Sequence, residues 1–400
     1  MELTRIQVLV FLCVSCELWE LARTLDDSTI VIPDPARLAR EINTAQKSWV
    51  ARDFYGRPVT YGDVKERLGS QLRRRKFSRV GFSRKDLPFY ATSDHGASYS
   101  GSQESCLNSN IDKITSDGYQ DMLPTVPRSF DLRRYYPACE SLNTIRQQSD
   151  CGSCWAVSSA GALSDRLCIA SGGKINVHIS AENLVTCCKT CGEGCDGGDT
   201  MTTWEHFMKD GEITGGDYGS GIGCKPYSIA PEAGTETVDI NAEETPPCVE
   251  ECTNPNYKIP YKEAPRYKTR NTYILPGTNL TIAQLDIMLN GPIVPSFMVY
   301  TDFMLYSSGV YRHTKGLNLG GHAVKLIGWG REKGVDYWLG ANSWGQNWGI
   351  KGVFKIRRGA NECLMEEYMV AGEPDVRDVS SMDQNESKEK KKPNDKNRQP

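Results

Sequence analysis

A cysteine placed to act as a nucleophile stands near the middle of the chain, in Gln148-Ser149-Asp150-Cys151-Gly152-Ser153-Cys154-Trp155. The residues that follow predict a helix from about Ser153 to Ser171-Gly172-Gly173, where glycine is a typical C-terminal signal. A thiol in the first turn of a helix lies near unpaired backbone N–H groups and the positive end of the helix dipole, which favours the thiolate. Cys154 is therefore a candidate nucleophile.

A cysteine nucleophile needs a base, and the base needs a group that fixes its tautomer. His322 lies in an apolar run from Gly320 to Gly330 that predicts one buried strand. A histidine that merely fills the core is the plain alternative there. Asn342 follows in Gly340-Ala341-Asn342-Ser343-Trp344 and supplies an amide with an aromatic ring to cover it.

Together these three segments resemble the papain-like cysteine proteases, whose local signature Cys-Gly-Ser-Cys-Trp the chain carries. The resemblance implies that Cys154 is the nucleophile and His322 the general base and acid. Asn342 would orient the imidazole, and Trp344 would shield that contact from water. The side-chain amide of Gln148 and the backbone N–H of Cys154 would form the oxyanion hole.

The cysteine content predicts a secreted protein with disulfides, since the chain has 15 cysteines. The order of their spacings resembles the cathepsin B-like members of the family. That resemblance implies a free Cys363 and the pairs Cys139–Cys168, Cys151–Cys195, Cys187–Cys248, Cys188–Cys191 and Cys224–Cys252.

The chain divides into four parts. Residues 1–22, with a short apolar run after Arg5, predict a signal peptide. Residues 23–125 resemble the family's propeptide, and residues 126–376 its mature domain. Residues 377–400 predict a disordered tail, because they contain few apolar side chains. The destination implied is secretion or the lysosome.

The fold class implied is α+β, with two domains and the active-site cleft between them. A helical domain would carry Cys154, and a β-barrel-like domain would carry His322 and Asn342. The inhibitory propeptide would cover the cleft. In it, Asp34-Pro35 predicts a helix start, and Leu38, Ile42, Ala45 and Trp49 predict one apolar helix face.

The resemblance also implies a substrate-binding surface. Gly197 and Gly198 would pair with an extended substrate, since only small residues let another backbone approach so closely. The remaining predicted contacts are Asp199, Thr200, Ser296, Ala323, Trp344 and Tyr368.

Several positions depart from the cathepsin B pattern. Residues 225–247 contain no histidine and are acidic, whereas cathepsin B has two adjacent histidines there that hold a substrate's C-terminal carboxylate. An acidic loop repels a carboxylate, so we expect an endopeptidase with weak or absent carboxydipeptidase activity. Tyr368 replaces a pocket glutamate that accepts arginine, which favours apolar residues, although Asp199 at the rim would favour a base.

Three smaller features of the sequence also bear on its function. Ser149-Asp150 stands where the family has Gly-Ser, and we expect Asp150 to tune the thiol. Residues 337–349 also resemble cathepsin B-like enzymes of blood-feeding worms. Asn279 and Asn385 begin glycan acceptor tripeptides.

Charge and composition limit the classes of partner that we expect. A net charge of −3 gives no argument for nucleic acid. No stretch outside the signal is long and apolar enough to span a membrane. The expected partners are protein and peptide substrates, the chain's own propeptide and cystatin-type inhibitors. We expect a monomer without a metal or organic cofactor.

Three other functions stay open at this stage. Cys151 and Cys154 form a C-x-x-C, which a thioredoxin-like redox protein would also carry. A structural zinc site would use Cys187, Cys188, Cys191 and Cys195. The third is an inactive binding protein on a cathepsin B-like scaffold.

Overall fold

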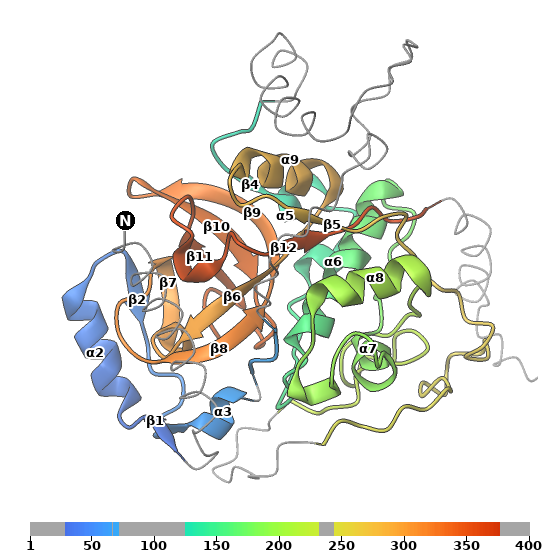
Figure 1. Ribbon diagram of the computed structural model, residues 1–400, viewed down its shortest axis with the longest axis horizontal. Helices are drawn as coiled ribbons and strands as arrows, with labels where there is room; N and C mark the ends of the chain where they lie inside the picture. Colours follow the sequence, from blue (N-terminus) through green and yellow to red (C-terminus); the bar gives the residue numbers. More distant parts are fainter. Residues whose placement is uncertain (1–28, 66, 72–124, 232–243, 377–400) are drawn as a thin grey trace, which may run out of the picture.

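The structure, a computed structural model, describes residues 29–65, 67–71, 125–231 and 244–376. Outside these residues lie the predicted signal peptide, residues 232–243 of the acidic loop and the C-terminal tail with Asn385. The described residues form a helical half and a β-rich half, which lie side by side in Figure 1. The predicted α+β class is confirmed.

The helical half is built around α6 (Cys154–Ala170), α7 (Ala181–Cys187) and α8 (Thr200–Lys209). Every residue of α6 from Cys154 to Cys168 is buried, because the helix packs against both α7 and α8 and the β-rich half. Its predicted start at Ser153 and its end before Gly172 agree with the observed bounds. The thiol is therefore held at the N-terminus of a helix that is fixed on all sides.

The β-rich half contains two sheets. The first has the strand order β2-β7-β11-β10-β9-β4 and the second the order β5-β12-β6-β8 within the described residues. Two short helices, α5 (Leu132–Tyr135) and α9 (Leu280–Asn290), pack beside them. The strands of this half are β4 (Phe130–Asp131), β5 (Tyr273–Leu275), β6 (Val294–Tyr300), β7 (Tyr306–Tyr311), β8 (Asn318–Ala323), β9 (Lys325–Glu332), β10 (Val335–Ala341), β11 (Val353–Arg357) and β12 (Met369–Ala371).

The single strand predicted for residues 320–330 is wrong. The run is divided at Val324 into β8, which pairs with β6, and β9, which pairs with β10 and β4. Both sides of the division are apolar and buried, so the residue pattern carried no sign of it. The division places His322 at the end of one sheet, next to the start of the other.

Residues 29–71 lie along the β-rich half as β1 (Ile30–Ile32), α2 (Pro35–Ala45), β2 (Trp49–Ala51), β3 (Val59–Thr60) and α3 (Tyr61–Lys65) (Figure 1). Strand β2 adds to the edge of the first sheet by pairing antiparallel with β7. The Asp34 carboxylate caps α2 by accepting from the Arg37 N–H at 2.7 Å, as the Asp-Pro signal predicts.

The prediction that Trp49 lies on the same helical face as Ile42 is wrong. Gln46 ends α2, because its side-chain oxygen accepts the N–H groups of Ser48 and Trp49 and turns the chain. Trp49 then lies in β2, with its ring centroid 5.0 Å from that of Tyr311. Its apolar side chain packs on the neighbouring sheet and not along the helix.

Five disulfides link the described residues, and they are the pairs that the resemblance implied. Cys139–Cys168 ties the segment that follows α5 to α6, and the other four crosslink the helical half. Cys154 and Cys363 are the free cysteines of this part of the chain. Such crosslinks narrow the ensemble of unfolded conformations and so stabilise the fold.

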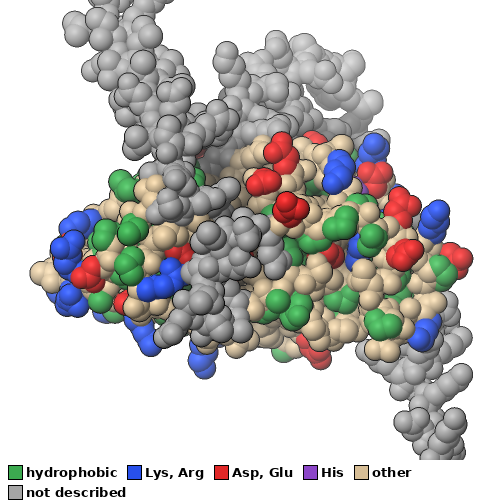
Figure 2. Space-filling view, turned by 90° about the horizontal axis from the view of Figure 1, so that it is seen from below, with side chains coloured by type: hydrophobic (Ala, Val, Ile, Leu, Met, Phe, Trp, Pro, Cys, Tyr) green, Lys and Arg blue, Asp and Glu red, His purple; other side chains and the backbone are tan. Residues whose placement is uncertain are grey.

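Charged side chains of both signs lie on the face of the molecule shown in Figure 2. On the face in Figure 2, lysine and arginine side chains gather mainly on the side of α2, and acidic side chains gather more on the helical side. Among the described helices, none is both long and apolar enough to cross a bilayer. Asn279 caps α9 by accepting the Thr281 N–H at 3.2 Å, and its glycosylation stays a prediction.

Candidate active site

Cys154 is the first residue of α6 and is fully buried. The backbone N–H of Ala323, at the end of β8, points at its sulfur with a nitrogen-to-sulfur distance of 3.4 Å. This contact spans the boundary between the helical and β-rich halves. The thiol therefore lies beside His322, the residue that precedes Ala323 in the chain.

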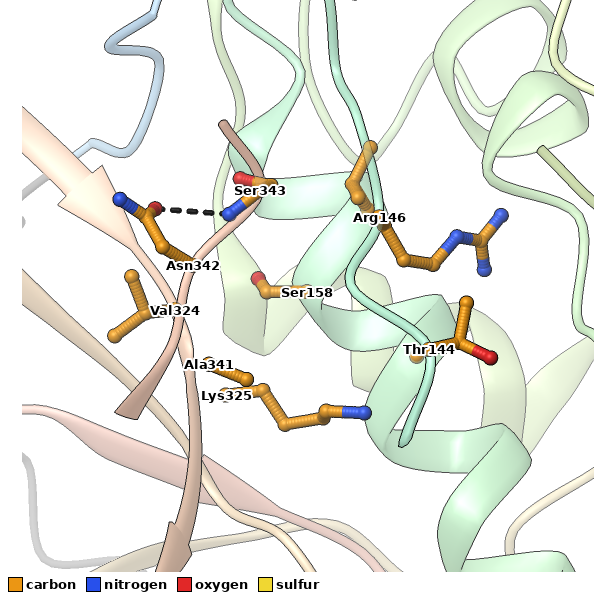
Figure 3. A pocket seen from close by; sticks show the side chains of 10 residues that line it. Thr144, Arg146, Ser158, Val324, Lys325, Ala341, Asn342 and Ser343 are labelled. Carbon is orange, nitrogen blue, oxygen red and sulfur yellow. Dashed lines mark hydrogen bonds between the residues drawn. The ribbon is translucent and has the colours of Figure 1, made fainter. Parts of the chain in front are cut away.

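His322 and Asn342 form a buried pair on neighbouring segments of the β-rich half. The imidazole Nε2 lies 2.8 Å from the Asn342 Oδ1, which also accepts the Ser343 N–H at 2.9 Å (Figure 3). Because the amide oxygen only accepts, Nε2 carries a proton and Nδ1 is left as the acceptor. Nδ1 has no hydrogen-bond partner among the described residues.

Trp344 covers this contact. Its ring centroid lies 4.8 Å from that of His322, and its side chain also packs against Phe303 in the core of the β-rich half. The exposed fractions of His322, Asn342 and Trp344 are 0%, 3% and 5%. A hydrogen bond between neutral groups is stronger when water is excluded from it, so the ring orientation is firmly set.

The side chain of Gln148 reaches the same place from the loop before α6. Its amide Nε2 donates to the Cys151 carbonyl at 2.8 Å, and its Oε1 accepts from the Ser343 hydroxyl at 2.6 Å. One amide hydrogen of Gln148 is left for a further acceptor. Ser343 was not predicted as a site residue, although it stands directly beside Asn342.

Residues 67–71 lie over these groups, with the Arg67 carbonyl accepting from the Trp344 indole N–H at 3.3 Å and Ser70 in a β-bridge to Gly198. The Gly198 N–H donates to the Gly69 carbonyl at 2.8 Å, and the Gln71 N–H donates to the Gly198 carbonyl at 2.9 Å. The pairing of Ser70 with Gly198 is parallel. Both backbone groups of Gly198, which the sequence predicts to bind substrate, are therefore occupied by the chain's own N-terminal region.

Comparisons with known proteins match this arrangement. The sequence profile of the papain family cysteine proteases matches residues 126–373.

The chain belongs to the papain family of cysteine proteases.

The relatives and solved structures narrow the likeness within the papain family. The chain is 46% identical over 258 residues to cathepsin B-like cysteine proteinase 4 of Caenorhabditis elegans, which covers 63% of this chain and 76% of that protein. It is 41% identical over 264 residues to a cathepsin B-like cysteine proteinase of Schistosoma japonicum, covering 64% and 75%. Procathepsin B S9 of Trypanosoma congolense is 30% identical with a TM-score of 0.65, covering 85% and 98%. This papain family member is a cathepsin B-like cysteine peptidase and has the fold of a zymogen.

Burial under residues 67–71 keeps the two central groups of this zymogen uncharged. It raises the pKa of the Cys154 thiol to about 11, although the N–H groups of Ala323 and Gly69 oppose that rise. It lowers the pKa of His322 to about 4, against the opposite effect of the hydrogen bond to Asn342. A neutral thiol and a neutral imidazole are the stable forms between these two values.

The two shifts set the pH range in which the covered state is favoured. In the covered state, in which residues 67–71 are in place, the pKa of His322 is lower than after these residues have left. The covered state therefore has its full stability above the pKa of the uncovered imidazole and loses it as the pH falls toward 4. The pKa of the Cys154 thiol is higher in the covered state than in the uncovered one. For the thiol, the covered state therefore has its full stability below the pKa of the uncovered thiol and loses it as the pH rises toward 11. Acid therefore loosens residues 67–71 by protonating His322.

The reactivity of Cys154 should follow from these values. In the full-length papain family zymogen, we expect alkylation of Cys154 by iodoacetamide to be slow from about pH 5 to 9 and to rise only as the pH approaches 11. Mass spectrometry of the labelled Cys154 peptide measures this rate separately from that of Cys363. A rate at pH 6 as high as that of the processed enzyme would contradict a buried, protonated thiol.

Tyr368, Ser296 and Ala323, which the resemblance predicts to bind substrate, lie near one another: Ser296 pairs with Ala323 across β6 and β8, and the Ala323 N–H points at the Cys154 sulfur. The Ser296 N–H donates to the Tyr368 carbonyl at 3.0 Å, and the hydroxyl oxygens of Ser70 and Ser296 lie 2.6 Å apart. Ser70 thus contacts one of the three residues predicted to bind substrate. Ala323 and Ser296 are fully buried, and Tyr368 is 8% exposed.

Asp199, which the sequence predicts to be a charge at the rim, is buried in this zymogen. Its carboxylate caps α8 by accepting the N–H groups of Met201 and Thr202 at 2.8 and 3.1 Å, and its exposed fraction is 2%. The Tyr368 hydroxyl donates to the same carboxylate oxygen at 3.4 Å. Thr200, the first residue of α8, is also fully buried. The Oδ1 oxygen of Asp199 therefore caps α8, a role that sequence spacing alone did not indicate.

Ser149, which replaces a family glycine, has a φ of 59°, in the left-handed region that favours glycine. Its hydroxyl donates to the Ile229 carbonyl at 3.2 Å, and this bond helps to hold it there. The neighbouring Tyr227 hydroxyl donates to the Gln148 carbonyl at 2.9 Å. The loop that carries Gln148 is therefore tied to the first residues of the acidic loop.

The disulfides argue against both the thioredoxin-like redox function and the structural zinc site. Cys151 is bonded to Cys195, so it does not form a dithiol pair with Cys154. The sulfurs of Cys188 and Cys191 lie near His206, but they are bonded to each other and are not available as thiolate ligands. Cys187 is bonded to Cys248. These cysteines crosslink the papain family fold.

Proposed function

We propose that Cys154, His322 and Asn342 form the catalytic site of a cathepsin B-like endopeptidase. The observation that carries the proposal is the buried bond from His322 Nε2 to Asn342 Oδ1, because it leaves Nδ1 as the acceptor on the side chain next to Cys154. Once residues 67–71 leave, water and substrate reach the thiol. Proton transfer from Cys154 to His322 then gives the thiolate and imidazolium pair that attacks a peptide carbonyl.

In the reaction we propose, the Cys154 sulfur forms a bond to the carbonyl carbon, and the oxygen becomes an oxyanion. The Gln148 Nε2–H and the Cys154 backbone N–H donate to that oxyanion. The His322 imidazolium then protonates the leaving amine as the carbon–nitrogen bond breaks. The neutral imidazole next takes a proton from water, which attacks the acyl-enzyme and releases the acid and the thiol.

The zymogen arrangement we propose has residues 23–125 as propeptide and residues 126–376 as the mature enzyme. It is supported by the paired backbones of residues 69–71 and Gly198, because a substrate needs the same donor and acceptor. Residues 1–22 would direct the chain to secretion or a lysosome. The expectation of a monomer and of inhibition by cystatin-type proteins belongs to the same proposal.

We also propose that the carboxydipeptidase activity of cathepsin B is weak or lost here. The support is chemical: residues 225–247 contain no histidine to hold a substrate carboxylate, and Glu232, Glu236, Asp239, Glu243 and Glu244 repel one. The catalytic residues themselves do not require such a loop. Internal cleavage is therefore the expected main activity.

Substrate preference provides the test of this function. The processed enzyme should hydrolyse N-blocked dipeptide amides with Leu or Phe two residues before the cut about tenfold faster, in kcat/KM, than those with Arg, because Tyr368 and not a free carboxylate closes the pocket. A Tyr368→Glu variant should reverse the order, and Tyr368→Phe is its matched control.

Two outcomes would count against these proposals. Preference of the wild type for Arg would show that Tyr368 does not close the pocket. The second outcome is that the protein, with its propeptide removed, hydrolyses none of these substrates although its Cys154 still reacts with iodoacetamide. That result would favour a binding protein on a cathepsin B-like scaffold.

A further inference from the structure

A buried ion pair crosses from the β-rich half to the helical half behind the proposed catalytic residues. Lys325 begins β9, three positions after His322. Its Nζ lies 2.5 Å from an oxygen of Asp165, a residue of α6. The exposed fractions of the two side chains are 6% and 0%. The pair therefore links the strand next to the imidazole with the helix that begins at the thiol.

The path of Lys325 across α6 depends on a glycine. A Cβ placed on Gly161 would lie 3.8 Å from the Cδ and the Nζ of Lys325, so the lysine side chain runs directly over this position. Figure 3 shows Lys325 extending from its strand toward α6, with Asn342 and Ser343 on the same strand side. A cavity of about 20 Å³, room for about one water, lies between these elements. Lys325, Asn342 and Ser343 all line this cavity.

The surroundings of the pair supply further buried charge. The Arg146 Nε lies 2.6 Å from an Asp217 oxygen, and a Cβ on Gly161 would lie 4.0 Å from the Arg146 Cδ. The imidazole of His178 also lies near these groups, and burial lowers its pKa. The second Asp165 oxygen has no hydrogen-bond partner in the described part of the chain. Asp165 therefore depends on Lys325 for its neutralisation.

We propose that Lys325 and Asp165 are positioning residues that fix the distance between Cys154 and His322. The argument rests on the proposed function of that pair of residues. A thiolate and an imidazolium stabilise each other by an energy that falls with their separation. An uncompensated buried charge draws in water or separates the packed elements, and either change would move α6 relative to β8. Loss of the ion pair should therefore weaken the thiolate and imidazolium pair without removing either group.

The test is the pH dependence of Cys154 alkylation by iodoacetamide in the processed enzyme, together with kcat and KM for one N-blocked peptide amide. In Lys325→Met, the acid limb of the alkylation profile should move up by about one pH unit. The value of kcat should fall ~10- to 100-fold, with little change in KM. Lys355→Met is the matched control, because Lys355 pairs with Glu332 at 2.6 Å within the β-rich half.

A Lys325→Met/Asp165→Leu variant keeps the test decisive if the single variant does not fold. Replacing both charges by apolar side chains removes the uncompensated carboxylate, so this variant should regain stability. We expect its acid limb to stay displaced, because the link between the two elements is still missing. A stable double variant with the wild-type profile and kcat would overturn the proposal and leave the pair with a purely structural role. Absence of hydrolysis by the wild type would instead count against the proposed function.

Discussion

His322→Ala should lower kcat/KM of the processed enzyme by about 10⁴-fold, the largest loss expected from any single change that leaves the thiol in place. Without the imidazole, no neighbouring group takes the thiol proton, and the leaving amine receives none. Hydrolysis of an N-blocked peptide amide measures the loss. Alkylation of Cys154 at alkaline pH shows in parallel that the protein is folded and the thiol accessible.

Asn342→Ala should lower kcat/KM as well, but by less than His322→Ala. It removes the oxygen that accepts from Nε2, so the imidazole gains rotational freedom but remains present. We expect a loss of about 10²-fold, smaller than for the histidine. Activity within a few-fold of the wild type in His322→Ala would show that a different base serves Cys154.

Gly69→Val should make the full-length zymogen accessible before it is processed. A Cβ at position 69 would lie 1.6 Å from the carbonyl oxygen of Gly152, which is backbone and has little freedom to move aside. Overpacking of a buried site costs about 1–3 kcal/mol, so the uncovered state should increase roughly 5- to 150-fold. The rate of Cys154 alkylation at pH 6 in uncleaved protein measures that population.

Thr44→Val provides the control for this change, because Thr44 lies on the exposed side of α2 and its hydroxyl bonds only to the Arg40 carbonyl in the same helix. It introduces the same side chain into the propeptide without meeting the mature domain. Equal alkylation rates in Gly69→Val and Thr44→Val would mean that residues 67–71 do not control access to the thiol.

Local sequence signals predicted the elements that carry the catalytic residues. The small, apolar residues after Cys154 and the glycines at 172 and 173 place both ends of α6 correctly. The Asp34-Pro35 start of α2 is an equally local signal. Helix boundaries of this kind depend on a few neighbouring residues, so they can be recognised in one sequence.

Features that depend on distant contacts were not predictable in the same way. Nothing near Val324 indicates that the apolar run divides between two sheets, since both strands are buried. The pairing of residues 69–71 with Gly198 and the Lys325–Asp165 bond each join segments more than 100 residues apart. The role of Asp199 as a helix cap was not predicted, because Asp199 follows two glycines that were expected to bind substrate.

The most direct test of the proposed catalytic site is product mapping by mass spectrometry. Acid-processed protein and its Cys154→Ala variant, processed in trans if it does not process itself, would each digest a folded protein and a library of peptides blocked at both ends at pH 5. We predict internal fragments from the wild type alone and few released C-terminal dipeptides. Equal cleavage by the Cys154→Ala variant, or none by the fully processed wild type, would contradict a peptidase that acts through Cys154.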